Sequence, residues 1–264
     1  MAKIIPFPVR THTAEGRTPQ SFTSTAQPSA LLPSILVVPV HNEEDQLERF
    51  LTAWRQQTPT LPMILVLDRC TDQSLSVARS FLEGLPKDES HFLQVQELLF
   101  NPYGKAGACL FGLWSVLRLQ LPFDYPVIFW DSDNEYQIDA DLLQRMMESI
   151  RTQGGMATAS RSGTRLLRSR LAHWATQTTL RLASRSPDMP EDILTAVHGM
   201  QLGHLLMALN GARSFDMETR MVRYALVHKM PIQEFSVQYH PRTKGKKIRA
   251  WHLFGILLAA VGLR

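Results

Sequence analysis

The sequence is poor in cysteine, which excludes a disulfide-stapled scaffold. Its 264 residues include only Cys70 and Cys109, which can form at most one disulfide and make no metal-binding pair. Their neighbours are apolar or helical, so we expect buried free thiols in a reducing compartment. Pro6 and Pro8 interrupt the apolar start of the chain, and no stretch there is long enough for a signal peptide. These absences predict a cytoplasmic protein.

Long apolar runs are also missing. No run reaches the roughly 18 to 20 consecutive apolar residues that a transmembrane helix requires. The longest, Leu253 to Leu263, is too short to span a bilayer but long enough for a helix that lies at its surface. We therefore expect at most a peripheral contact at the cytoplasmic face of a membrane.

Signatures of several enzyme classes are absent. The turn at Gly104-Lys105 is not a Walker A sequence, which argues against a P-loop kinase. No pair of histidines has the spacing of a zinc site. A nucleotidyltransferase would need a glycine-rich loop after the first strand, where this chain has His41-Asn42-Glu43-Glu44. Signatures of serine hydrolases and of protein kinases are missing too.

The charge is divided unevenly along the chain. Residues 1–150 carry 11 Lys and Arg against 18 Asp and Glu, whereas residues 151–264 carry 17 against 6. A basic C-terminal half suits an anionic partner, although an ordinary solvated basic face explains the charge equally well. No aromatic interleaving or nucleic-acid module accompanies the basic cluster, so we expect no nucleic-acid partner. We expect Arg242, Lys246 and Lys247, beside Gly245, to close over a diphosphate.

Apolar runs and helical patterns alternate from Ser34 onward. Residues 1–33 are rich in Thr, Ser, Pro and Gln and are predicted to be disordered. Residues 34–249 are predicted to form one domain, followed by an apolar C-terminal helix at 250–264. Continuous apolar strands between helices predict an α/β fold whose mostly parallel sheet is covered by helices on both faces. Strands are expected at 35–40, 63–67, 92–98, 126–130 and 155–160, and helices around 47–54 and at 74–82, 105–119 and 140–151.

Polar clusters follow three of the predicted strands. They are His41-Asn42-Glu43, Asp68-Arg69 and Asp131 to Glu135. Ligands of parallel sheets bind where the strands end, so these clusters predict one shared crevice. There Asp68 has the place of a carboxylate that binds a nucleobase or ribose, or else caps the next helix with Asp72.

Asp131, Asp133 and Glu135 stand at alternating positions after a buried strand. In extended chain, alternate side chains point the same way and can converge on one hard cation, here Mg²⁺ or Mn²⁺. The alternative is an acidic turn before a helix whose N-cap is Asp139. Lys105 at a glycine-rich helix start suits an anion such as a phosphate.

These motifs, taken in order, resemble the inverting glycosyltransferases of family 2, which have the GT-A (Rossmann-like) fold. The resemblance is greatest to dolichol- or polyprenyl-phosphate mannose and glucose synthases. It covers about Ile35 to Arg249. The matching segments are Val38–Glu44, Leu67–Ser74, Gly104–Ala108, Asp131–Glu135, Ala159–Arg161, Phe215–Glu218, Glu234–Arg242 and Gly245–Ile248.

The resemblance implies metal-dependent transfer, with inversion, from a UDP- or GDP-linked sugar to a polyprenyl phosphate or another phosphorylated acceptor. It implies Asp131, Asp133 and Glu135 as ligands of Mg²⁺ or Mn²⁺, with the two aspartates catalytic. Asp192 would be the base if the acceptor is a hydroxyl. The implied donor-binding residues are Pro39, His41, Asn42, Glu43, Asp68, Lys105, Ser132 and Arg161.

In the second nucleotide motif, Arg69-Cys70 stands where a second acid and a glycine are usual. Two further departures from the family pattern are that Glu191 to Met200 is longer between its acid and its glycine than the synthases' segment, and that the trailing membrane helices of many relatives are missing. The first of these leaves the acceptor and the identity of any base open. Two other interpretations stay open. One is a glycosyltransferase with a soluble small-molecule or phosphorylated acceptor. The other is a non-catalytic membrane-surface protein that retains the fold, although Asp131 and Asp133 argue against it.

Overall fold

A computed structural model describes residues 9–12, 34–162, 167–184, 189–240 and 250–263. In this part of the chain the strands form one eight-stranded sheet in the order β1-β4-β3-β2-β5-β7-β6-β8. Strands β4, β3, β2 and β5 are mutually parallel, as are β6 and β8, while β7 is antiparallel to both its neighbours. The strands are β1 (Val9–His12), β2 (Ile35–Val40), β3 (Met63–Asp68), β4 (Leu93–Leu98), β5 (Pro126–Phe129), β6 (Met156–Ser162), β7 (His198–Gln201) and β8 (Ile232–Gln238).

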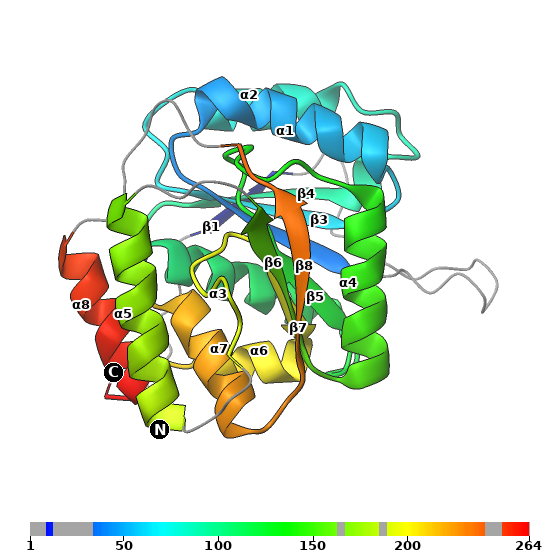
Figure 1. Cartoon of the computed structure of the whole chain (residues 1–264). Coiled ribbons are helices and arrows are strands. Elements are labelled where there is room, and N and C mark those ends of the chain that lie inside the picture. Colours follow the sequence, from blue (N-terminus) through cyan, green and yellow to red (C-terminus); the bar gives the residue numbers. More distant parts are fainter. Residues whose placement is uncertain (1–8, 13–33, 163–166, 185–188, 241–249, 264) are drawn as a thin grey trace.

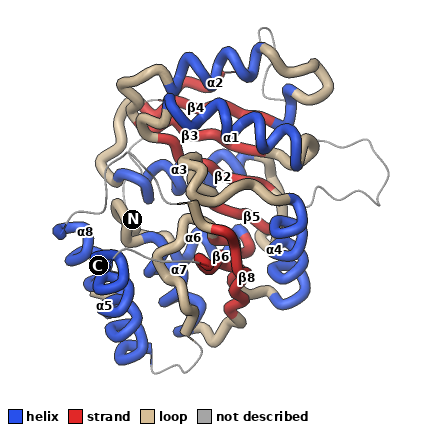
Figure 2. Tube along the Cα trace, turned by 45° about the horizontal axis from the view of Figure 1, so that its top comes forward, coloured by secondary structure: helices blue, strands red, loops and turns tan. Residues whose placement is uncertain are grey.

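Helices cover both faces of the sheet (Figure 1). Helices α1, α2 and α4 pack on one face, and α3, α6 and α7 pack on the other. Helices α5 and α8 lie side by side and pack against α7, outside these layers (Figure 2). The helices are α1 (Glu44–Gln57), α2 (Ser74–Glu83), α3 (Gly104–Arg118), α4 (Ala140–Gln153), α5 (Leu167–Ser184), α6 (Leu202–Ala208), α7 (Met217–Val227) and α8 (Ala250–Val261).

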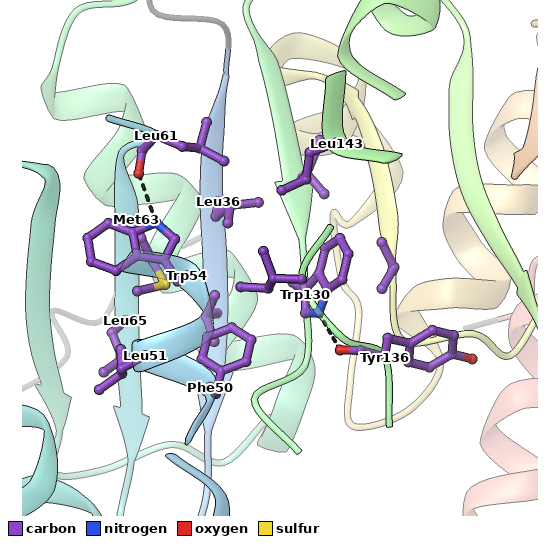
Figure 3. Packing of buried hydrophobic residues seen from close by; sticks show 14 of the residues in the cluster. Leu36, Phe50, Leu51, Trp54, Leu61, Met63, Leu65, Trp130, Tyr136 and Leu143 are labelled. Atoms are coloured by element: carbon purple, nitrogen blue, oxygen red, sulfur yellow. Dashed lines mark hydrogen bonds between the residues drawn. The ribbon is translucent and has the colours of Figure 1, made fainter. Parts of the chain in front are cut away.

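The central strands are apolar along their whole length because both of their faces are buried. Leu36 and Val38 of β2 belong to the core under α1, whereas Ile35 and Val37 belong to the core under α3. On the α1 side, Trp54 and Trp130 lie among aliphatic side chains (Figure 3), and each indole N–H donates to a backbone carbonyl, 3.0 and 3.2 Å away. The two cores, with both indole N–H groups paired, hold the carboxyl ends of the strands in place.

The predicted mostly parallel sheet with helices on both faces is confirmed. The expectation of disorder over 1–33 is wrong for Val9–His12, which pair antiparallel with β4. The remainder of that segment lies outside the described residues. Strand β1 was missed because its sequence, Val-Arg-Thr-His, has no apolar run and adds only to the edge of the sheet.

The apolar C-terminal segment forms helix α8, as expected. Its inner side packs on α5 and α7, with Ile256 and Ala260 buried. Phe254 and Val261 of α8 are 67% and 41% exposed. In the described residues no helix combines the length and the apolar character that crossing a bilayer requires. The inner face of α8 is therefore buried against α5 and α7, whereas its outer face exposes apolar side chains.

Asp139 caps helix α4, as the alternative interpretation of the acidic run expected. Its carboxylate accepts hydrogen bonds from the backbone N–H groups of Asp141 and Leu142. Replacing Asp139 with Ala should therefore lower the free energy of unfolding by about 1 kcal/mol, measured by urea denaturation. Asp139→Asn keeps the acceptor oxygen and should stay close to the wild type. Equal losses in the two variants would contradict the capping role.

Candidate active site

The loops after β2 and β3 are joined by hydrogen bonds at the carboxyl edge of the sheet. Asn42 and Thr71 bond to each other at 2.8 and 3.2 Å, and the Glu44 carboxylate accepts from the backbone of Gln73 at 2.7 Å. The backbone N–H of Glu43 donates to Ser74 at 2.8 Å. These bonds fix the predicted donor-binding segment from Pro39 to Glu43 against the second loop without any ligand.

Asp68 ends β3 with its side chain 95% buried and both carboxylate oxygens paired. The guanidinium of the neighbouring Arg69 donates to them at 2.9 and 3.3 Å, and this hydrogen bonding raises the pKa of Arg69. Arg69 reaches back in this way because its backbone is left-handed, with φ of 48°. His41 bonds to the Asp68 carbonyl at 2.6 Å. A nucleobase or ribose at Asp68 would have to share that carboxylate with Arg69.

The loop after β5 presents two acidic side chains and buries the serine between them. Asp131 and Asp133 are partly exposed, whereas Ser132 is 2% exposed. The expected extended chain is not what produces this alternation, because residues 132 and 133 form a turn. The Ser132 side chain, predicted to bind the donor, is therefore less accessible than either aspartate.

The three predicted metal ligands do not converge. In the described part of the chain, no three His, Cys, Asp or Glu side chains are grouped so that they could hold a metal ion. Glu135 lies near Tyr239, whose pKa is raised by burial and then by this carboxylate. Mg²⁺ is commonly held by one or two carboxylates together with substrate phosphates. Asp131 and Asp133 fit that ligand set, and the predicted set of three including Glu135 does not.

Lys105 lies between two carboxylates at the centre of the site. Its ammonium donates to Asp131 at 2.8 Å and to Glu218 of α7 at 2.9 Å. Burial alone would lower the pKa of Lys105, but the two carboxylates hold it well above its usual range. Burial also raises the pKa of Glu218, against the opposing effect of Lys105. Lys105 was expected at a phosphate, and in the structure it already has two anionic partners.

A tight turn at the start of α3 places Lys105 in the site. Gly104 has a φ of 57°, and a side chain at Gly107 would collide with the amide of Asn101. That amide donates to the Gly104 carbonyl at 2.7 Å and accepts from the Tyr103 N–H at 2.9 Å. Gly104 therefore allows the left-handed turn that begins the helix, and Gly107 leaves room for the amide of Asn101.

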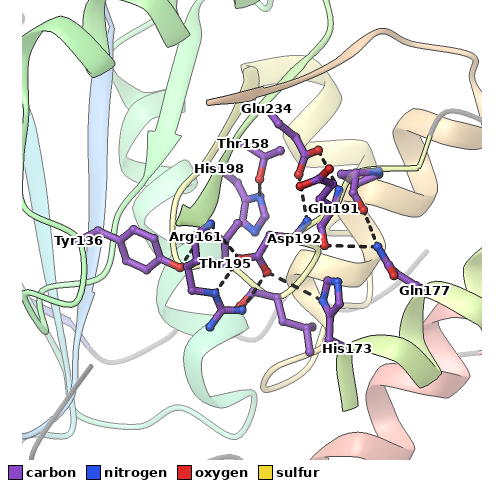
Figure 4. A network of polar contacts seen from close by, with 12 residues as sticks. Tyr136, Thr158, Arg161, His173, Gln177, Glu191, Asp192, Thr195, His198 and Glu234 are labelled. Carbon is purple, nitrogen blue, oxygen red and sulfur yellow. Dashed lines mark hydrogen bonds and ion pairs between the residues drawn. The ribbon is translucent and has the colours of Figure 1, made fainter. Parts of the chain in front are cut away.

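Arg161 and Asp192 form a closed ion pair on the other side of the site (Figure 4). The guanidinium donates to the two carboxylate oxygens at 2.6 and 2.8 Å and to the Leu194 carbonyl at 2.9 Å. Its carbon also lies 5.4 Å from the ring centroid of Tyr239. Asp192 has no exposed surface and is occupied by Arg161. This position suits a residue that orients Arg161 better than a base that meets an acceptor.

The sequence did not predict a role for Glu218 or for His198. Glu218 is separated from Lys105 by 113 residues, so no local spacing links them. The matching of Phe215–Glu218 to the family's late helix was the one available signal. His198 starts β7, is 1% exposed and bonds to Thr158 at 2.9 Å. The predicted phosphate-binding residues Arg242, Lys246 and Lys247 lie outside the described residues.

Comparison with protein families assigns residues 35–166 to a known family. Residues 35–166, half of the 264 residues, match the model described as Glycosyl transferase family 2. The match includes the loops after β2, β3 and β5 and the start of α3. A search of curated protein sequences gave no significant match.

Solved structures with a similar fold include glucosyl-3-phosphoglycerate synthase from Mycobacterium tuberculosis in complex with UDP. It is 16% identical, with a TM-score of 0.58, and the alignment covers 88% of this chain and 81% of that one. The same enzyme with Mn²⁺, UDP-glucose and phosphoglyceric acid is 14% identical, with a TM-score of 0.58 and 91% and 87% coverage. A third structure, of a mycobacterial protein, is 16% identical, with a TM-score of 0.56 and 88% and 75% coverage. The likeness confirms the GT-A (Rossmann-like) fold.

Burial lowers the pKa of His198 to about 3, from 6.5, and the nearby charge of Lys105 contributes. The imidazole thus stays neutral in the folded chain while the unfolded chain takes up a proton below pH 6.5. The stability that this gives is present above pH 6.5 and is lost as the pH falls toward 3, by at most about 1.4 kcal/mol per pH unit.

His198→Asn keeps a partner for Thr158 and removes the titrating group. Urea denaturation between pH 7 and 5 should show a shallower loss of stability in the variant than in the wild type. Equal slopes would show that His198 does not titrate as its burial implies.

Proposed function

The chain belongs to glycosyltransferase family 2, and we propose that it transfers a sugar, with inversion, from a nucleoside-diphosphate sugar to a phosphorylated acceptor in a metal-dependent reaction. The observation that carries this proposal is the grouping of Lys105 with Asp131 at the carboxyl edge of the sheet, 2.8 Å apart, one residue before Ser132-Asp133. UDP or GDP would be the leaving group.

The central chemical task is to stabilise the charge that develops on the leaving diphosphate. Asp131 and Asp133 would hold Mg²⁺ or Mn²⁺, which when bound neutralises part of that charge. The similar enzyme from Mycobacterium tuberculosis has been solved with UDP and either ion. The ammonium of Lys105 would add a fixed positive charge, and Asp68 with Arg69 would face the nucleoside.

The burial of Asp192 and its pairing with Arg161 favour an acceptor that needs no general base. A hydroxyl acceptor must lose a proton, whereas a phosphate oxygen is already ionised. Because Asp192 is fully buried and paired with Arg161, it supports the second case. Structures of the similar Mycobacterium tuberculosis enzyme contain phosphoglyceric acid, a phosphorylated compound that also carries a hydroxyl group and so is compatible with either case. Polyprenyl phosphate and a soluble phosphomonoester are therefore the two acceptors to compare.

A panel of UDP- and GDP-linked sugars, assayed with and without Mn²⁺, tests the proposal. Polyprenyl phosphate and 3-phosphoglycerate serve as acceptors, and NMR of the product gives its anomeric configuration. Metal-dependent transfer with inversion is expected for one donor–acceptor pair. Retention of configuration would overturn the proposed inversion. No transfer across the panel would overturn the proposed transfer to a phosphorylated acceptor.

Asp133→Asn should reduce transfer by about 100-fold or more while thermal stability stays unchanged, because its work is on the cation and diphosphate. The variant keeps an acceptor for the Glu135 N–H, 3.0 Å from Asp133. Asp124→Asn is the matched control, since Asp124 is exposed and precedes β5 at the opposite end of the same strand. Full activity of Asp133→Asn in metal-containing buffer would remove Asp133 from the site.

A membrane-bound acceptor has one specific observation in its favour. The packed helices α5 and α8 expose Trp174, Leu182 and Phe254 by 65%, 76% and 67%. Apolar side chains of this kind on paired surface helices suit a bilayer interface, where a polyprenyl phosphate would be met. We propose this peripheral contact as the second candidate, with the acceptor in the membrane.

Flotation with anionic liposomes tests the membrane contact. Phe254→Ser should lower the membrane partition constant by about 10- to 100-fold, because one buried aromatic side chain contributes roughly 1.5 to 3 kcal/mol. Phe123→Ser is the control, since Phe123 is 68% exposed and lies in the loop between α3 and β5. If the wild type does not float, or if both variants lose binding equally, the soluble acceptor is the better assignment.

A further inference from the structure

Glu218 is a buried carboxylate to which the proposed reaction gives no task. It lies in the first turn of α7 and is 5% exposed. One carboxylate oxygen accepts from Lys105 at 2.9 Å, and the other has no hydrogen-bond partner. The start of a helix favours negative charge, and the backbone N–H of Glu218 itself contributes to this. Lys105 is therefore the described partner of the Glu218 carboxylate.

The ammonium of Lys105 has one donor more than its described partners use. Three N–H groups are available, and two are directed at Asp131 and Glu218. A cation held by Asp131 would compete with Lys105 for that carboxylate and would repel the ammonium. Glu218 would then be the remaining anchor that keeps the ammonium beside the diphosphate.

We propose that Glu218 is a positioning residue, which holds the ammonium of Lys105 against the leaving diphosphate when the donor and cation are bound. The proposal rests on the proposed function, because it assumes a diphosphate beside Asp131. Glu218 acts through Lys105 and does not itself touch the substrate.

The affinity of Glu218→Gln for a polyanion separates the positioning role from one in which Glu218 only offsets the positive charge of Lys105. If Glu218 only adds negative charge, Glu218→Gln should bind a polyanion more tightly, because a repelling charge has been removed. If Glu218 positions Lys105, the same variant should bind the polyanion more weakly, because a charge-assisted contact to the ligand is lost. Removing the charge thus gives opposite changes under the two roles.

The experiment is calorimetric titration of inorganic pyrophosphate into the full chain at saturating Mg²⁺. This probe tests the diphosphate site without the unknown base and sugar. We expect Glu218→Gln to weaken binding by roughly tenfold. Asp216→Asn is the matched control, because Asp216 is 1% exposed and bonds to Arg220 and to the Arg213 N–H instead of Lys105. It removes the same charge from the same end of α7 and should change binding by less than about twofold.

A double-mutant cycle with Lys105→Met completes the test. In the Lys105→Met background, adding Glu218→Gln should weaken pyrophosphate binding no further. Unchanged or tighter binding by Glu218→Gln alone, or an equal loss in both backgrounds, would overturn the positioning role. If the wild type itself does not bind pyrophosphate, the proposed diphosphate site fails, and this inference fails with it.

Thermal unfolding of each variant shows whether it is folded. Should Glu218→Gln not fold, Glu218→Asp supplies the same test, because it keeps the charge and withdraws the carboxylate by one methylene. Positioning then predicts weaker binding, and charge neutralisation predicts wild-type binding.

Discussion

The site depends on the placement of one buried ammonium between two carboxylates. Lys105 comes from the start of α3, Asp131 from the end of β5 and Glu218 from the start of α7. Three segments that are far apart in sequence therefore meet at the ammonium of Lys105. Its two ion pairs link α3, β5 and α7 at the carboxyl edge of the sheet. Two negative charges close together would repel each other without the ammonium, and a buried ammonium without them would lose its charge. Each member thus requires the other two, and the sheet and helices supply the rigidity that holds them within hydrogen-bond distance.

A second ion pair, between Arg161 and Asp192, has a different character. It is closed on itself, with both carboxylate oxygens engaged and no exposed surface on Asp192. The Lys105 group is open, with one donor and one carboxylate oxygen lacking described partners. Closed pairs fix the shape of a site, whereas open ones can rearrange when a ligand brings its own charge.

Much of the fold could be predicted because its strands are buried on both faces. The run Ile35 to Val40 and the run Val127 to Trp130 are apolar without interruption, and Asp68 and Asp131 follow such runs directly. Strand β1 could not be predicted, because an edge strand needs no apolar run. Pairings across long separations were equally out of reach. Spacing alone could not reveal that Glu218 accepts a hydrogen bond from Lys105, that Arg69 pairs with Asp68, or that Glu135 lies near Tyr239.

The short strand β1 has a consequence for solubility. It pairs with β4 along four residues, from Val9 opposite Leu98 to His12 opposite Val95. Without it, β4 would present a row of unpaired N–H and C=O groups at the margin of the sheet. Such a margin is a template for pairing with another chain, and apolar Leu99 and Phe100, 47% and 57% exposed, follow directly after it. With β1 in place, the edge of the sheet is a strand of only four residues that carries the charged Arg10, and such an edge is a poorer template for pairing with another chain.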